Sequence, residues 1–144
     1  MIAHLKKNTR GAVPGLAVHF ERKTDHHTNK EIDVSKSYLN QDLMADGSDM
    51  LSRFNARLND VYCMKRDDVK VLATWIVTLP EELTEAPYEQ QSAFLEATTN
   101  FLNDRYGQEN TVAAVVHYDE TAPHLRYAFS PVFLYNRTCK NRLK

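Results

Sequence analysis

The residues best suited to chemistry form a short run near the end of the chain, His-Tyr-Asp-Glu-Thr-Ala-Pro-His-Leu-Arg, which begins at His117. Apolar segments flank it, and two strands joined by a tight turn would place His117 beside His124. Arg126 would then share a face with His124, because strand side chains alternate with period two. Two imidazoles with Asp119 and Glu120 in the turn suit a divalent ion such as Mn²⁺ or Zn²⁺.

Hydrophobic patterning predicts the elements that must position this run. We expect a helix from Ser48 to about Met64, a strand from Val69 to Leu79, a helix after Pro87 that ends at Tyr106-Gly107, and strands at Thr111–Tyr118 and His124–Tyr135. The first forty residues show no clear pattern. A late hairpin implies antiparallel pairing, so the predicted fold class is α+β, an antiparallel β-sheet with helices packed on one face.

Composition narrows the class of protein. The 144 residues, with 42% hydrophobic and 26% charged, are typical of one globular domain, so we expect residues 1–144 to form a single domain. No apolar run has the length of a membrane span or a signal peptide. Four glycines and the lack of a phosphate-binding loop motif argue against nucleotide-driven chemistry. Cys63 and Cys139 lack metal-site spacing, and we expect reduced thiols in a cytoplasm, with a disulfide as the alternative.

The net charge of −1 hides an uneven distribution. Residues 1–40 hold seven Lys/Arg against four Asp/Glu, residues 41–123 hold six against fifteen, and residues 124–144 hold five with no acid. If the fold brings the two basic ends together, they form one cationic face that suits nucleic acid.

The histidine run resembles the third motif, HxDExxPHxH, of the MobV (Mob/Pre) family of plasmid mobilisation relaxases. Two upstream segments are similar to the other motifs of that family. His19-Phe-Glu-Arg22 resembles the first, HNxR, and the segment from Asn29 to Leu43 resembles the second, an Asn followed by a Ser/Arg-rich turn and an Asn-x-x-Leu ending. The three motifs occur in the family's order and cover nearly the whole chain.

This resemblance implies a relaxase of the HUH-endonuclease type. Such enzymes hold one divalent cation, here expected to be Mn²⁺ or Mg²⁺, on a histidine cluster of the central strands. They nick single-stranded DNA at an origin of transfer and leave a 5′-phosphodiester link to the protein. The ion acts as a Lewis acid at the scissile phosphate, and the nucleophile divides one hydrolysis into two reversible transfers.

The resemblance also implies residue roles. His19 and Glu120 are expected to be catalytic, with His19 as nucleophile and Tyr38 as the alternative. The expected metal ligands are His117, His124 and Glu120. The residues expected to contact DNA or order the loop beside it are Arg22, Asn29, Lys36, Ser37, Asn40 and Arg126. His26 and His27 are expected to be solvated.

Arg126 stands where the family has histidine, and a guanidinium has no lone pair for a cation. Three outcomes follow: metal binding through His117, His124 and an acid, a phosphate held by the guanidinium itself, or a DNA-binding module that does not cut. The chain ends about twenty residues after the run, so we expect the family's oligomerisation region to be absent. A rolling-circle initiator would need a helical tyrosine after the hairpin, whereas Tyr127 and Tyr135 lie on the predicted strand.

Overall fold

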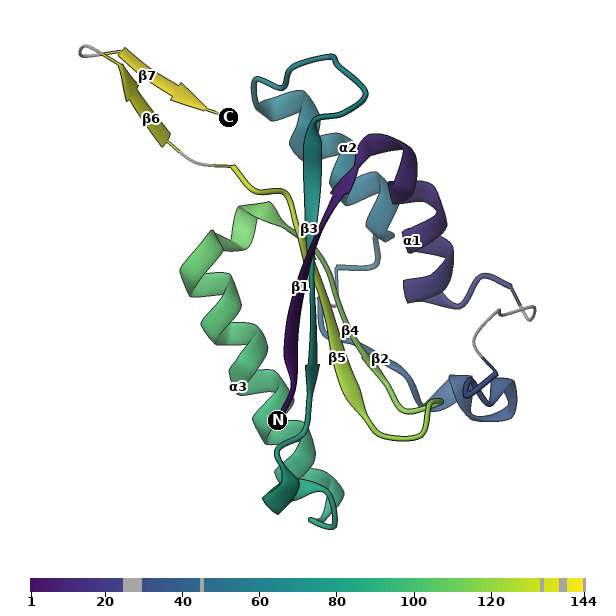
Figure 1. Ribbon diagram of the computed structural model, residues 1–144. Helices are drawn as coiled ribbons and strands as arrows, with labels where there is room; N and C mark the ends of the chain where they lie inside the picture. Colours follow the sequence, from purple (N-terminus) through teal and green to yellow (C-terminus); the bar gives the residue numbers. More distant parts are fainter. Residues whose placement is uncertain (25–29, 45, 133, 138–139, 144) are drawn as a thin grey trace.

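A five-stranded antiparallel sheet forms the centre of the computed structural model, in the order β1-β3-β5-β4-β2 (Figure 1). The structure describes residues 1–24, 30–44, 46–132, 134–137 and 140–143. The strands of this sheet are β1 (Ala3–Thr9), β2 (Gln41–Asp42), β3 (Lys70–Thr78), β4 (Thr111–His117) and β5 (His124–Phe129). The antiparallel α+β class expected from the sequence is therefore confirmed.

Helices cover both faces of the sheet rather than one face, as Figure 1 shows. On one face, α1 (Val13–Glu21) and α2 (Met50–Asp60) bury Phe20 and Phe54 against the sheet. On the other, α3 (Tyr88–Tyr106) packs Leu95 against Leu125 and Tyr127. β4 is buried along its whole length, so both of its faces need an apolar cover. Within the described part of the chain, no helix is long and apolar enough to span a membrane.

Capping residues set the ends of the helices. The carboxylate of Asp49 accepts a hydrogen bond from the Ser52 amide at 2.8 Å and starts α2. This helix is shorter than expected because the chain is already extended at Val61. Pro87 precedes α3, and Gly107 ends it with a φ of 90°.

The first forty residues contain β1, α1 and two short 3-10 segments, η1 (Arg10–Ala12) and η2 (Val34–Leu39). Two further 3-10 segments are η3 (Glu81–Leu83) and η4 (Gln108–Asn110). β1 pairs with β3 and forms one edge of the sheet. The first forty residues therefore contain regular secondary structure that their sequence pattern did not predict.

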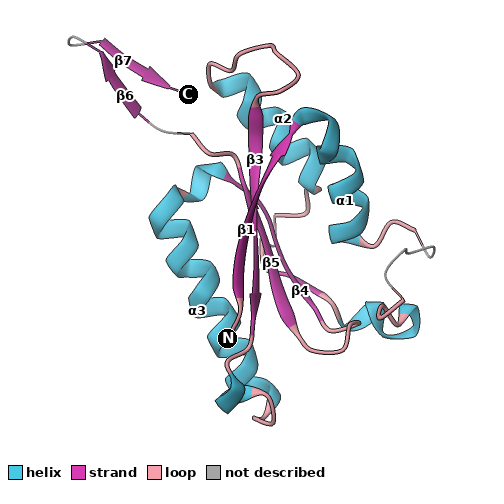
Figure 2. Cartoon of the chain, in the orientation of Figure 1, coloured by secondary structure: helices cyan, strands magenta, loops and turns pink. Residues whose placement is uncertain are grey.

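The last predicted strand, His124–Tyr135, is divided in two. β5 ends at Phe129, and β6 (Leu134–Arg137) pairs with β7 (Lys140–Leu143) in a separate hairpin (Figures 1 and 2). This hairpin follows the end of β5 opposite to His124. β5 therefore leaves the sheet at the end where β1 reaches Thr9, and the single cationic face stays a prediction.

The hairpin of β4 and β5 has the register that the sequence predicts. His117 lies directly opposite His124, and Arg126 lies opposite Val115. Leu125 and Tyr127 face α3, so His124 and Arg126 face the side of α1.

Candidate metal and nucleic-acid site

Three histidines from separate elements meet where α1 crosses the end of the β4–β5 hairpin. The ring of His117 lies 5.9 Å from that of His19 and 5.5 Å from that of His124, measured between centroids. His117 is fully buried and His124 nearly so. The structure thus brings together three of the predicted site residues.

His117 presents an unused lone pair to this cluster. Its Nε2 lies 2.9 Å from the carbonyl oxygen of Phe20, so Nε2 carries the proton and donates. Its Nδ1 is buried and has no hydrogen-bond partner among the described residues. Burial lowers the pKa of His117 to about 3, which keeps the ring neutral at physiological pH. A neutral imidazole with a free lone pair is a suitable metal ligand.

Glu120 supplies an oxygen beside this lone pair. Its Oε1 lies 3.8 Å from His117 Nδ1. One ligand atom each from His19, His117 and Glu120 lie within 4.8 Å of one another, a group that could hold a metal ion. These residues therefore fit a divalent cation, although His19 was expected to be the nucleophile and not a ligand.

His124 is less available to a cation than the sequence suggested. Its Nδ1 lies 3.1 Å from the carbonyl oxygen of Ala122, so Nδ1 carries the proton. Its Nε2 then accepts a hydrogen bond from Arg126 Nε at 3.3 Å. The nitrogen that would bind a metal is occupied by the residue that replaces the family's last histidine.

Arg22 connects the end of α1 to the carboxylates of the turn. Its Nε and Nη2 donate to Asp119 at 2.8 and 2.9 Å, and Nη2 also donates to Glu120 at 2.8 Å. Its Nη1 donates to the carbonyl oxygen of His19 at 2.9 Å. The resemblance gave Arg22 a role at DNA or in ordering the loop beside it, and the structure pairs its guanidinium with two carboxylates.

These contacts keep both acids ionised. Burial alone would raise the pKa of Asp119, but hydrogen bonds from Arg22 and Ser37 hold it well below its usual range. Burial likewise opposes ionisation of Glu120, and the hydrogen bond from Arg22 together with the charges of Arg126 and Arg22 lowers its pKa. The sequence placed Asp119 beside Glu120 as a candidate carboxylate for an ion, and in the structure its two oxygens accept from Arg22 and Ser37.

Two residues of the segment around η2 form hydrogen bonds with the turn between β4 and β5. Ser37 Oγ donates to Asp119 Oδ2 at 2.7 Å, and Asn40 Oδ1 accepts from the Tyr118 amide at 2.7 Å. Ser37 and Asn40 were expected to contact DNA or to order the loop beside it, and in the structure they hold this turn. Lys36 and Tyr38 are exposed, with Tyr38 82% accessible. Asn29, His26 and His27 lie outside the described residues.

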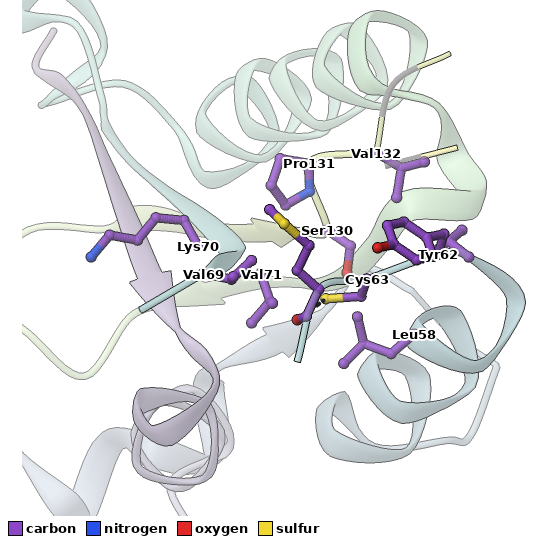
Figure 3. A pocket seen from close by; sticks show the side chains of 11 residues that line it. Leu58, Tyr62, Cys63, Val69, Lys70, Val71, Ser130, Pro131 and Val132 are labelled. Carbon is purple, nitrogen blue, oxygen red and sulfur yellow. Dashed lines mark hydrogen bonds between the residues drawn. The ribbon is translucent and has the colours of Figure 1, made fainter. Parts of the chain in front are cut away.

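A separate cavity lies at the opposite end of the sheet from the histidines. It has a volume of about 140 Å³ and lies between the segment after α2 and the segment after β5 (Figure 3). Its lining is mainly apolar and includes Leu58, Cys63, Val71 and Ser130. Cys63 is a free thiol, and Cys139 lies outside the described residues. This cavity shares no residue with the histidine cluster.

Comparison with known proteins places this geometry in a family. The sequence model described as "Plasmid recombination enzyme" matches residues 1–144. The chain belongs to the plasmid recombination enzyme (Mob/Pre) family. A plasmid recombination enzyme of Lactiplantibacillus plantarum is 33% identical over 90% of this chain and 37% of its own length. One of Bacillus thuringiensis is 30% identical over 94% of this chain and 31% of its own. The chain thus spans about a third of the curated plasmid recombination enzymes that it matches.

Solved structures of the same family share the fold. The MobM relaxase domain, in a Mn-bound crystal structure with plasmid pMV158 oriT DNA, superposes with a TM-score of 0.79 at 27% identity. The match covers 97% of this chain and 72% of the MobM chain. A second Mn-bound MobM complex gives a TM-score of 0.76.

Proposed function

We propose that this chain is a relaxase domain that binds single-stranded DNA at an origin of transfer and nicks it with a divalent cation, Mn²⁺ or Mg²⁺. The observation that carries the proposal is the buried, unpartnered Nδ1 of His117 beside Glu120 and His19. The Mn²⁺ and oriT DNA of the MobM complex support it. We also propose that residues 1–144 act as one domain, since α1, the η2 segment and the β4–β5 hairpin jointly build the site. We place this domain in a bacterial cytoplasm.

Each residue of the site has a definable task. When bound, the cation supplies Lewis-acid charge at the scissile phosphate. His117 stays neutral and is oriented by its bond to the Phe20 carbonyl. Arg22 fixes Glu120 and the backbone at His19 relative to each other.

His19 is the proposed nucleophile. A lone pair of its imidazole attacks the phosphorus, and the bond from phosphorus to the 3′-oxygen breaks. The 3′-oxygen takes up a proton from water, the second ring nitrogen of His19 gives up its N–H proton to water, and the 5′ phosphoryl group stays bonded to the attacking nitrogen. Religation by the 3′-hydroxyl reverses these steps. Tyr38 is the alternative nucleophile, and its high exposure leaves its hydroxyl accessible to DNA.

One observation favours a second candidate function, a DNA-binding module that does not cut. Arg126 Nε donates to the His124 nitrogen that a cation would need. A guanidinium beside the ligand group also repels a divalent ion. In this version the fold and the DNA interaction are retained, and metal-dependent cleavage is lost.

A calorimetric titration with Mn²⁺ separates the two candidates. We expect the native protein to bind Mn²⁺ and His117→Ala to lose binding by at least tenfold, because the buried lone pair is removed. His4→Ala is the matched control, since His4 is an exposed histidine on β1 outside the cluster. Binding by Arg126→His alone would favour the non-cutting module.

The nicking assay then tests the activity itself. Single-stranded DNA carrying the origin of the chain's own replicon is incubated with the protein and Mn²⁺, and covalent adducts are resolved by denaturing electrophoresis. We expect an adduct that is absent with His19→Ala and retained with Tyr38→Phe. The reverse pattern would assign the nucleophile to Tyr38, and absence of any adduct would reject the enzymatic proposal.

A further inference from the structure

Arg126 carries a half-buried charge without an ionic partner. It lies in the middle of β5, and its hydrogen bond in the described part of the chain joins Nε to the His124 ring. Among the described residues, no carboxylate lies within 4 Å of its guanidinium, although Glu120 faces it at longer range. Arg22, the other arginine of the site, contacts both Asp119 and Glu120.

An unpaired guanidinium in this position indicates a missing anion. Removing a charge from water costs free energy unless a partner compensates it. The bond from Nε to His124 fixes the plane of the guanidinium and leaves its two terminal amino groups to donate elsewhere. A pair of terminal N–H groups matches two oxygens of a phosphate.

The sheet face beside Arg126 is open to such a ligand. Arg126 lies opposite Ile76 of β3, and Ile76 lies opposite His4 of β1. Ile76 is half-buried and His4 is exposed, so this row of the sheet runs from the buried histidines to solvent. An extended strand of nucleic acid can therefore reach the guanidinium from the side of β1.

We infer that Arg126 binds a phosphate of single-stranded DNA directly, so that this chain binds DNA without a divalent cation. The inference rests on the proposed function and deepens it, because it separates DNA binding from cleavage. In this arrangement His124 is a positioning residue that holds the guanidinium through its Nε2.

Fluorescence anisotropy with a labelled single-stranded origin oligonucleotide tests this inference. We expect the native protein to bind with equal affinity, within twofold, in EDTA and in Mn²⁺. Arg126→Gln should weaken binding in EDTA at least tenfold and reduce the slope of log K against log salt by about 0.7, the value for one phosphate contact to a single strand. Arg66→Gln is the matched control, because Arg66 is exposed and far from the site in the chain. It should leave affinity and slope unchanged.

Two further variants keep the test decisive if Arg126→Gln fails to fold in a thermal melt. Arg126→Lys retains the charge, and we expect it to preserve the salt slope while losing affinity. Arg126→His should make DNA binding depend on Mn²⁺. The inference would be overturned if the native protein failed to bind DNA in EDTA. It would also be overturned if folded Arg126→Gln or Arg126→His bound DNA in EDTA as tightly as the native protein does. In either case, DNA binding in Mn²⁺ would still support the proposed function. Failure of every variant to bind DNA in Mn²⁺ would reject both.

Discussion

Arg22 adopts a backbone conformation that is unusual for its side chain. Its φ of 51° and ψ of 48° lie in the left-handed region, which costs a non-glycine residue on the order of 1 kcal/mol. Glycine would end α1 with less strain, but it would remove the guanidinium that joins His19 to Asp119 and Glu120. The strained conformation therefore persists because the side chain satisfies two buried carboxylates.

Replacing Arg22 tests this account at the scale of one residue. We expect Arg22→Gln to lower the free energy of unfolding by about 3 kcal/mol, because it leaves Asp119 and Glu120 buried without their counter-charge. Urea denaturation measures the change. Arg66→Gln, which removes an exposed ion pair with Asp68, should change stability by less than about 0.5 kcal/mol. Equal changes in the free energy of unfolding for the two variants would show that the buried network stabilises the protein no more than an exposed ion pair does.

Sequence could predict which residues meet in the hairpin but not how they bond. The period-two rule placed His117, His124 and Arg126 together, and the register confirms this. The tautomers of the histidines depend on the carbonyls of Phe20 and Ala122, which only the folded chain brings near. The contact between Arg22 and Asp119 joins positions 97 residues apart, so local spacing held no signal for it.

At the scale of elements, Arg53 ties α2 to the sheet and to the turn before it. Its Nη1 donates to the Val112 carbonyl at 3.0 Å, and its Nη2 donates to the Ser48 carbonyl at 2.6 Å. It also pairs with Asp46 at 2.7 Å. The Arg53 side chain is 9% exposed, so these bonds are largely shielded from water.

We expect Arg53→Met to destabilise the protein by about 2 kcal/mol, because several hydrogen bonds are lost and the Val112 carbonyl loses a partner. Urea denaturation at neutral pH measures this, and an unchanged midpoint would contradict it.

Asp46→Asn removes the ion pair with Arg53 and leaves the other hydrogen bonds of Arg53 in place. Hydrogen bonds from Arg53 and Ser48 hold the pKa of Asp46 well below its usual range. The contribution of the Asp46 carboxylate to the free energy of unfolding is therefore present above about pH 4, the pKa of Asp in the unfolded chain. It is lost as the pH falls through the lowered native pKa.

The elements that sequence predicted are those with a one-sided or fully apolar pattern. β3, β4, β5, α2 and α3 have such patterns and were found within a few residues of their true limits, apart from the C-terminal end of β5. β1 was missed because an edge strand is exposed on both faces, and its sequence Ala-His-Leu-Lys-Lys-Asn-Thr has no apolar alternation. The packing of helices on both faces depends on chain topology, which pattern alone does not determine.

At the scale of the whole molecule, one face of the sheet is only partly covered. α1 and α2 contact β4, whereas His4 and Lys6 of β1 on that same face are exposed. Together with Ile76 and Arg126, these two residues form an open strip across β1, β3 and β5. Charge arithmetic along the chain could not find this strip, because it depends on strand register.

Two adjacent lysines test whether DNA follows the open strip. Lys6 lies on the strip, whereas Lys7 lies on the opposite face, beside Ala73 in the register. We expect Lys6→Gln to weaken single-stranded DNA binding several-fold and to reduce the salt slope by about 0.7. Lys7→Gln removes the same charge from the other face and should have little effect. Equal losses in anisotropy titrations would indicate a general charge effect instead of a defined path.

His117 pairs directly with His124, so an odd or an even change in the length of the intervening turn has a different effect on which face of the sheet the β5 side chains occupy. Sliding β5 along β4 by one residue would turn His124 and Arg126 toward α3 and bring Leu125 among the histidines. Sliding β5 by two residues would return every side chain to its own face, displaced by two residues along β4. Natural or engineered changes of the turn should therefore be tolerated in steps of two residues, while a single deletion inverts the site even if the fold survives.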